Sequence, residues 1–175
     1  MQVVTISGKA RHGKDTSAEL MKKLFEEKGL KCYIYHYADP VKMCAKNYFG
    51  WSGEKDAVGR TLLQNIGTDR ARAKCMSTWT DFAKQIIERV LFDADVVIIP
   101  DCRFPNEIEC WEGKAISVHV TRTDFESNLT EEQKNHPSEN ALNDYIFNYF
   151  VEAKDLEELS DGINIVANDI IEGRI

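Results

Sequence analysis

The segment between residues 8 and 16 has the composition of a phosphate-binding loop. It follows the apolar run Val3–Ser7, precedes a segment of helical periodicity, and reads Gly8, Lys9, Ala10, Arg11, His12, Gly13, Lys14, Asp15, Thr16. Gly8 and Gly13 allow backbone conformations that a Cβ would resist, so successive N–H groups can point at phosphate oxygens. The helix start adds a positive dipole end, and the Lys14 ammonium can reach terminal phosphates. These nine residues are predicted to bind ATP, with Lys14 catalytic.

Asp15 stands where such loops usually carry Ser or Thr, whose hydroxyl holds Mg²⁺. Two interpretations stay open. The Asp15 carboxylate binds Mg²⁺ or its water shell while Thr16 takes a phosphate oxygen, or Asp15 only stabilises the start of the helix. Mg²⁺ is expected as the cofactor, with ATP as co-substrate.

A second charged segment follows the apolar run Val96–Pro100 and begins at Asp101. Ligands of parallel α/β sheets collect beyond the carboxyl ends of the strands, so Asp101 should face Lys14. Arg103 is predicted to be catalytic, and Asp101 and Glu107 are predicted to hold the acceptor. A purely structural alternative is a helix entry with Pro105 at its first position and acids in its first turn.

The stretch from residue 59 to residue 72 contains three arginines and Gln64. Arginine forks suit phosphate and glutamine suits the edge of a base, so the acceptor is expected between the segment 39–72 and the Asp101 edge. The predicted substrate-binding residues in this segment are Asp39, Gln64, Thr68 and Arg72.

Residues 122–140 are polar and read as a long excursion from the sheet. We expect a lid here, with Arg122 delivering a catalytic cation when it closes over the substrates. The alternative is a static surface helix capped by Thr130.

Short β-rich runs alternate with segments of helical period, which predicts an α/β fold with a parallel sheet covered on both faces. Strands are expected over Val3–Ser7, Cys32–Tyr37, Val96–Pro100, Ala115–Val120 and Tyr145–Phe150. Helices are expected after Lys14 as far as Gly29, from an Asp39 cap with Pro40 at the first position, from a Thr78 cap to Leu91, and from Asp155 to Glu172.

Length and charge exclude several classes of function. The chain has 175 residues, which fits one domain, and a net charge of −7, which disfavours a nucleic-acid polymer as partner. The five cysteines show no disulfide or zinc spacing, and neither a signal peptide nor a membrane span is indicated. A cytoplasmic protein without a membrane partner is expected.

The chain resembles the phage-type deoxynucleoside monophosphate kinases of the P-loop kinase superfamily, which are adenylate-kinase-like. The resemblance rests on residues 8–16, on residues 63–69 with Arg72, on residues 101–107, and on His136-Pro137-Ser138-Glu139. It implies a P-loop NTPase fold over 1–175, with a three-layer sheet of about five strands, an NMP-binding segment at about 38–80 and a lid at about 122–140. It also implies transfer of the γ-phosphoryl group of ATP to a (deoxy)nucleoside monophosphate, in the host cytoplasm if phage-encoded, with a homodimer possible.

Other functions remain open at this stage. The serious competitor is a P-loop kinase for a non-nucleotide metabolite, such as phosphomevalonate or dephospho-coenzyme A, because some of those share the aspartate after the lysine. A nucleotide switch needs a guanine-reading Asn-Lys-x-Asp, which the sequence lacks. A non-catalytic nucleotide-binding scaffold is disfavoured only mildly by Asp101, Arg103 and Arg122.

Overall fold

The computed structural model describes residues 1–54, 56–125 and 129–174. Its internal contacts divide the chain into two compact units. The first comprises Met1–Tyr35 and Leu91–Ile175, and the second comprises His36–Val90. The second unit contains the segment of about 38–80 that the sequence marks for acceptor binding, and each unit is described by itself below.

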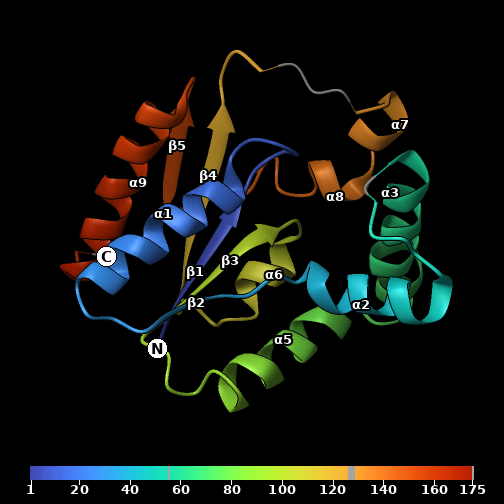
Figure 1. Cartoon of the computed structure of the whole chain (residues 1–175), viewed down its shortest axis with the longest axis horizontal. Helices are drawn as coiled ribbons and strands as arrows, with labels where there is room; N and C mark the ends of the chain where they lie inside the picture. The colour runs from blue at the N-terminus through green and yellow to red at the C-terminus, as the bar shows by residue number, and fades with distance from the viewer. Residues whose placement is uncertain (55, 126–128, 175) are drawn as a thin grey trace. The chain divides into compact units, whose positions relative to one another are not determined.

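The first unit is built on a five-stranded parallel sheet with strand order β2-β3-β1-β4-β5 (Figure 1). The strands are β1 (Gln2–Ser7), β2 (Cys32–Ile34), β3 (Val96–Cys102), β4 (Ala115–Arg122) and β5 (Tyr149–Ala153). β1 lies in the middle, and its pairing with β3 shifts register between Thr5 and Ser7. This irregularity comes immediately before the glycine-rich loop.

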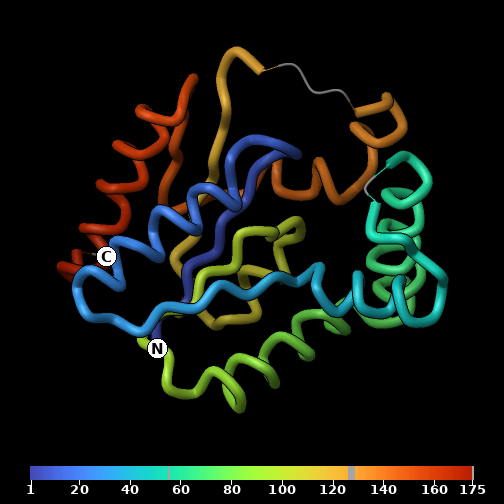
Figure 2. The backbone as a smooth tube through the Cα atoms, viewed as in Figure 1, coloured from blue at the N-terminus to red at the C-terminus, as the bar shows by residue number. Residues whose placement is uncertain are grey.

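Helices α1 and α9 pack side by side against one face of the sheet (Figures 1 and 2). The helices of this unit are α1 (Lys14–Glu27), α6 (Pro105–Glu109), α7 (Glu131–Lys134), α8 (Pro137–Asn140) and α9 (Leu156–Ile171). Apolar side chains that alternate along β1, β3 and β4 form the core with these two helices, as period-two strands require. Ser7 and His119 point to the other face because their neighbours Ile6, Val118 and Val120 fill the core.

The second unit is helical over its described residues. Its elements are α2 (Ala38–Phe49), α3 (Ala57–Gln64), the π-helical segment η1 (Asn65–Arg70), α4 (Ala71–Lys74) and α5 (Thr78–Arg89). Trp79 of α5 is largely buried and donates its Nε1 hydrogen to the Gly67 carbonyl oxygen at 2.8 Å. This bond ties α5 to the middle of η1.

The last strand begins four residues later than the sequence suggests. The alternation of aromatic residues predicts a strand over Tyr145–Phe150, but β5 runs from Tyr149 to Ala153. Asn148 explains the difference, because its side-chain oxygen accepts hydrogen bonds from the Ser117 N–H at 2.8 Å and hydroxyl at 2.9 Å. The Asn148 side chain thus bonds to β4 where a backbone hydrogen bond of the sheet was expected. The aromatic residues Tyr145 and Phe147 before it pack against each other instead.

Other element boundaries differ by a few residues. β2 ends at Ile34 rather than at Tyr37 because α2 begins at Ala38, and Asp39 lies inside the first turn of that helix instead of capping it. Thr78 is the first residue of α5 and Ser77 precedes it as the cap position. The described helices include none long and apolar enough to cross a membrane.

Candidate active site

The loop between β1 and α1 forms a concave run of backbone that fits an anion. Gly8, Arg11 and Gly13 have φ angles of 143°, 65° and 91°. A Cβ on Gly8 would lie 2.2 Å from the carbonyl oxygen of Val120 in β4, so only glycine fits there. Alternation between right- and left-handed residues turns backbone N–H groups toward one point. We call residues 8–13 the cradle.

Lys14 opens α1 at the base of the cradle and is only 8% exposed. Its Nζ donates a hydrogen bond to the Lys9 carbonyl oxygen at 2.7 Å, so the ammonium spans the loop. Burial lowers the pKa of Lys14 to about 7, with the nearby charge of Arg103 as the second cause, while Glu139, Asp15 and Asp101 oppose the shift. A charge held in so little solvent interacts strongly with an arriving phosphate.

Arg103, just beyond β3, reaches the cradle because the buried carboxylate of Glu107 holds its backbone. Glu107 is 2% exposed and accepts hydrogen bonds from the N–H groups of Arg103 at 2.5 Å and Phe104 at 3.1 Å. Pro105 begins α6, as the sequence predicts. The Arg103 guanidinium donates to the Gly8 carbonyl oxygen at 3.2 Å. Glu107 therefore orients Arg103, and its contact with an acceptor stays a prediction.

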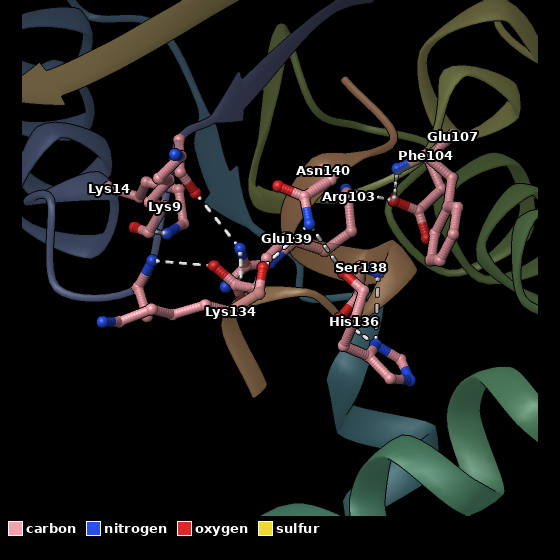
Figure 3. A network of polar contacts seen from close by, with 12 residues as sticks. Lys9, Lys14, Arg103, Phe104, Glu107, Lys134, His136, Ser138, Glu139 and Asn140 are labelled. Carbon is pink, nitrogen blue, oxygen red and sulfur yellow. Dashed lines mark hydrogen bonds and ion pairs between the residues drawn. The ribbon is translucent and has the colours of Figure 1, made fainter. Parts of the chain in front are cut away.

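Glu139 lies in the mouth of the cradle, between the loop and Arg103 (Figure 3). One carboxylate oxygen is 3.0 Å from the Arg103 Nη1 atom, and the other accepts the Ala10 N–H at 3.3 Å. The side chain is 11% exposed. The Glu139 carboxylate thus occupies a backbone donor of the kind that binds anion oxygens, and ATP binding at this loop stays a prediction.

Short helix α8 presents Glu139 through its own capping contacts (Figure 3). The His136 Nδ1 atom accepts the Ser138 N–H at 3.2 Å, and Pro137 starts the helix. The Asn140 side chain donates to the Lys134 carbonyl oxygen at 2.8 Å, which joins α8 to α7. The motif His136-Pro137-Ser138-Glu139 thus forms a short helix that positions the Glu139 carboxylate beside the cradle.

The tip of the cradle is fixed to the end of β4. The Arg122 N–H donates to His12 Nδ1 at 3.1 Å, and the rings of His12 and Phe125 meet edge-on at 5.7 Å. The exposed Arg122 guanidinium lies over the same Phe125 ring at 5.0 Å. Burial lowers the pKa of His12, and the charges of Lys14 and Lys9 lower it further, so the imidazole remains a neutral acceptor at pH 7.

The surroundings of Lys14 fit a magnesium ion held together with phosphates. Mg²⁺ usually takes one or two carboxylates plus substrate oxygens and water. Asp15 and Thr16 are exposed at the start of α1, and Asp15 and Asp101 both act on the Lys14 charge from nearby. Groups of three or more metal-ligating side chains do not occur among the described residues. Such a partial carboxylate set would need phosphate oxygens or water to complete the coordination of the ion.

The predicted site residues divide between the two units. Residues 8–16, Asp101, Arg103, Glu107 and Arg122 all belong to the first unit. In the second unit, Asp39 pairs with Lys42 at 2.7 Å, and Gln64 and Thr68 are half-buried in α3 and η1. Arg72 is 6% exposed and donates to the Met76 carbonyl oxygen at 3.4 Å. Substrate binding by these four residues stays a prediction.

The expected lid contains the two short helices α7 and α8. Thr130 caps α7 with a capping box, in which the Thr130 hydroxyl accepts the Gln133 N–H at 3.2 Å and the Gln133 side chain returns to the Thr130 N–H. This is the helix that the static alternative requires. Residues 126–128 of the segment lie outside the described residues, and closure of a lid stays a prediction.

Sequence reasoning missed the role of Glu139 and of His119. His119 lies in β4 with Nδ1 3.0 Å from the Ser7 hydroxyl oxygen, and burial lowers its pKa. The motif around Glu139 stood out in the sequence without a function. His119 is an isolated histidine in an apolar strand, which by itself does not indicate a function. Its position opposite Ser7 is apparent only in the structure.

No protein-family model and no curated protein matches the chain by sequence. Solved structures resemble the chain in fold. Shikimate kinase from Acinetobacter baumannii in complex with shikimate is 14% identical, with a TM-score of 0.51 over 100% of this chain and 96% of that chain. Shikimate kinase from Aquifex aeolicus is 12% identical, with a TM-score of 0.51 over 99% and 98%. Mycobacterium tuberculosis APS kinase in complex with AMPPNP and APS is 11% identical, with a TM-score of 0.45 over 98% and 95%.

The likeness to the two shikimate kinases concerns the fold. A five-stranded parallel sheet flanked by helices, with a glycine-rich loop after the central strand, is the fold of the P-loop kinases. The fold class predicted from the sequence is therefore confirmed.

Proposed function

We propose that the protein is an ATP-dependent kinase that transfers the γ-phosphoryl group to a (deoxy)nucleoside monophosphate. The observation that carries the proposal is the meeting of Lys14 and Arg103 at one loop, with donor contacts to the Lys9 and Gly8 carbonyl oxygens. Two cations beside a cradle of N–H groups suit a polyphosphate whose terminal group is being transferred. The resemblance to phage-type deoxynucleoside monophosphate kinases supplies the acceptor class.

Transfer itself needs few covalent contributions from the protein. An oxygen of the acceptor phosphate attacks the γ-phosphorus, the bond from that phosphorus to the β–γ bridging oxygen breaks, and ADP leaves. A phosphate monoester is already ionised near neutral pH, so no general base is required. Asp15 and Asp101 would hold Mg²⁺ beside the donor phosphates, where the ion would supply positive charge that neutralises the phosphate oxygens.

The residues of the first unit then act by position and charge. The cradle N–H groups and Lys14 hold the donor phosphates, and displacement of Glu139 from Ala10 frees both the loop and Arg103. Arg103, kept in place by Glu107, stabilises charge on the transferring group. Arg122 at the end of β4 adds a cation from the rim of the cradle.

A non-nucleotide acceptor is the second candidate. Asp15 after the loop lysine and the structural likeness to kinases named for shikimate both keep it open. Phosphomevalonate and dephospho-coenzyme A are its representative acceptors.

One panel assay separates these functions. ADP release from Mg²⁺-ATP is measured with each ribo- and deoxyribonucleoside monophosphate, with phosphomevalonate and with dephospho-coenzyme A, and the product is identified by phosphorus NMR. We expect a nucleoside diphosphate from at least one deoxynucleoside monophosphate. Turnover confined to phosphomevalonate or dephospho-coenzyme A would overturn the proposal in favour of the second candidate.

A further inference from the structure

A cavity of about 210 Å³ opens beside the cradle, entirely within the first unit. Its lining includes Gly8, Lys9 and the Arg103–Glu139 ion pair of the proposed phosphate site. It also includes four ring-bearing side chains, namely His119, Tyr145, Phe147 and Phe150. The same space therefore joins charged groups of the cradle to an aromatic wall.

Phe147 is the centre of the aromatic wall. Its ring centroid is 4.9 Å from that of His119, 5.0 Å from that of Tyr145 and 5.6 Å from that of Phe150. Phe147 is 6% exposed, whereas Phe150 is 63% exposed. The wall lies apart from the core between the sheet and α1 and α9. A wall of ring faces and edges with one exposed member suits the insertion of another planar ring.

Uncharged polar groups lie among these rings. His119 is neutral at pH 7, because burial and the neighbouring lysines lower its pKa, and its Nδ1 atom is engaged by Ser7. The amide of Asn143 lines the cavity and also donates to the Asn140 side-chain oxygen at 3.3 Å. An imidazole and an amide can both donate and accept hydrogen bonds, which matches the edge of a heterocycle better than a hydrocarbon.

We propose that this cavity is the acceptor subsite and that it takes a phosphate monoester of a planar heterocycle. The ring lies against Tyr145, Phe147 and Phe150, and the phosphate points toward Lys9 and Arg103. The inference rests on the proposed function and deepens it, because it assigns the ring-binding surface to the first unit. An aliphatic acceptor such as phosphomevalonate gains nothing from an aromatic wall.

The test measures binding without turnover. Deoxynucleoside monophosphates are titrated calorimetrically into the protein saturated with Mg²⁺ and a non-hydrolysable ATP analogue, and 2-deoxyribose 5-phosphate serves as the ring-free probe. We expect Tyr145→Leu and Phe150→Ala to weaken binding of the accepted deoxynucleoside monophosphate about tenfold, which is typical of one lost stacking partner. Binding of 2-deoxyribose 5-phosphate should be unchanged.

Two further variants separate stacking from damage to the fold. Ile146→Ala lies between two wall residues, is 90% exposed and does not line the cavity, so it should bind every probe as the wild type does. Tyr145→Phe retains the ring and should retain most of the affinity.

Unchanged monophosphate binding in both Tyr145→Leu and Phe150→Ala would overturn the subsite, even if the panel assay shows nucleotide turnover. Equal affinity of the wild type for ring-bearing and ring-free phosphates would overturn it as well.

Failure of the proposed function has a different signature. Deoxynucleoside monophosphates would then bind to the wild type and more weakly to Tyr145→Leu and Phe150→Ala, but they would yield no diphosphate with ATP. That result would support the subsite as a binding site and would reject the kinase function.

Discussion

Lys14 combines deep burial with a position among charged groups. It is 8% exposed, and its pKa is lowered to about 7 by loss of solvent and by Arg103. The side chain contributes little to the apolar core, since its Nζ atom bonds a loop carbonyl. We therefore expect Lys14 to serve ligand binding rather than the stability of the fold.

Replacing Lys14 should separate catalysis from folding. We expect Lys14→Ala to lower kcat/KM by at least about a hundredfold, because one positioned cation in a dry site commonly contributes several kcal/mol to the transition state. The thermal unfolding midpoint should stay equal or rise, since a buried ammonium is costly. Steady-state kinetics and a melting curve provide both readouts, and near-normal kcat/KM would remove Lys14 from the reaction.

The same pKa predicts that nucleotide binding takes up protons. Because burial lowers the pKa of Lys14 to about 7, part of the free protein carries a neutral Lys14 near pH 7, and bound polyphosphate favours the charged form. ATP binding should then take up a fraction of a proton at pH 7 and a larger fraction at pH 8. Calorimetry in buffers of different ionisation enthalpy measures the uptake. Lys14→Arg, which stays charged, provides the baseline for protons that belong to ATP itself.

At the scale of elements, the four-residue helix α8 places a negative charge at the loop where we propose that the donor phosphates bind. Glu139 pairs with Arg103 and accepts the Ala10 N–H, so the protein's own carboxylate occupies one donor of the cradle. If a nucleotide binds here as proposed, this side chain has to leave the Ala10 N–H.

Glu139→Gln should therefore tighten nucleotide binding. Removing one negative charge from the cradle is expected to lower the Kd for Mg²⁺-ADP about three- to tenfold, and kcat should change little because Glu107, not Glu139, holds Arg103 in place. Glu132→Gln on α7 changes the net charge equally on an exposed side chain and should leave both values unaltered. Weaker binding in Glu139→Gln, measured by calorimetry, would instead mean that the carboxylate assists the nucleotide.

Gly162 in α9 shows how an apparent defect in a helix supports packing. In the sequence it lowers helix propensity, but a Cβ at this position would lie 2.6 Å from Val151 Cγ1 in β5. The glycine allows α9 to approach the edge strand closely.

A double-mutant cycle tests this contact. Gly162→Ala should destabilise the protein by about 1 to 3 kcal/mol through overpacking, despite the gain in helix propensity. In a Val151→Ala background the same change should stabilise it by several tenths of a kcal/mol to about 1 kcal/mol. Denaturant unfolding gives the four free energies. Additive effects would show that the helix adjusts without strain.

Across the whole molecule, short-range patterns were more predictable than long-range contacts. The cradle could be predicted because an apolar strand, two glycines, a lysine and a helix lie within 30 residues. The hydrogen bond between Ala10 and Glu139 joins residues 129 positions apart. Neither segment contains a sequence pattern that predicts contact with the other. β5 was misplaced because the Asn148 side chain replaces a backbone bond, which hydrophobic alternation cannot reveal.

Acid should weaken the fold through two histidines beside the cradle. Burial is the main cause of the lowered pKa of both His12 and His119. In the unfolded chain they take up protons near the ordinary value of about 6.5, before the folded protein does. The free energy of unfolding should therefore decrease as the pH falls below about 6.5. Denaturant titrations between pH 7.5 and 5.5 should show a smaller decrease in His119→Asn than in the wild type.

The Glu139 carboxylate in the cradle should also limit which anions can bind to the loop. A lone sulfate or inorganic phosphate has to compete with Glu139 for the Ala10 N–H, and Glu139 is tethered to the same chain and already neutralised by Arg103. A tethered competitor acts at high effective concentration, so a weak free anion loses to it. In the proposed function, a nucleoside triphosphate engages several cradle donors and Lys14 at once, so its multiple contacts should displace Glu139. We therefore expect the loop to discriminate against small free anions.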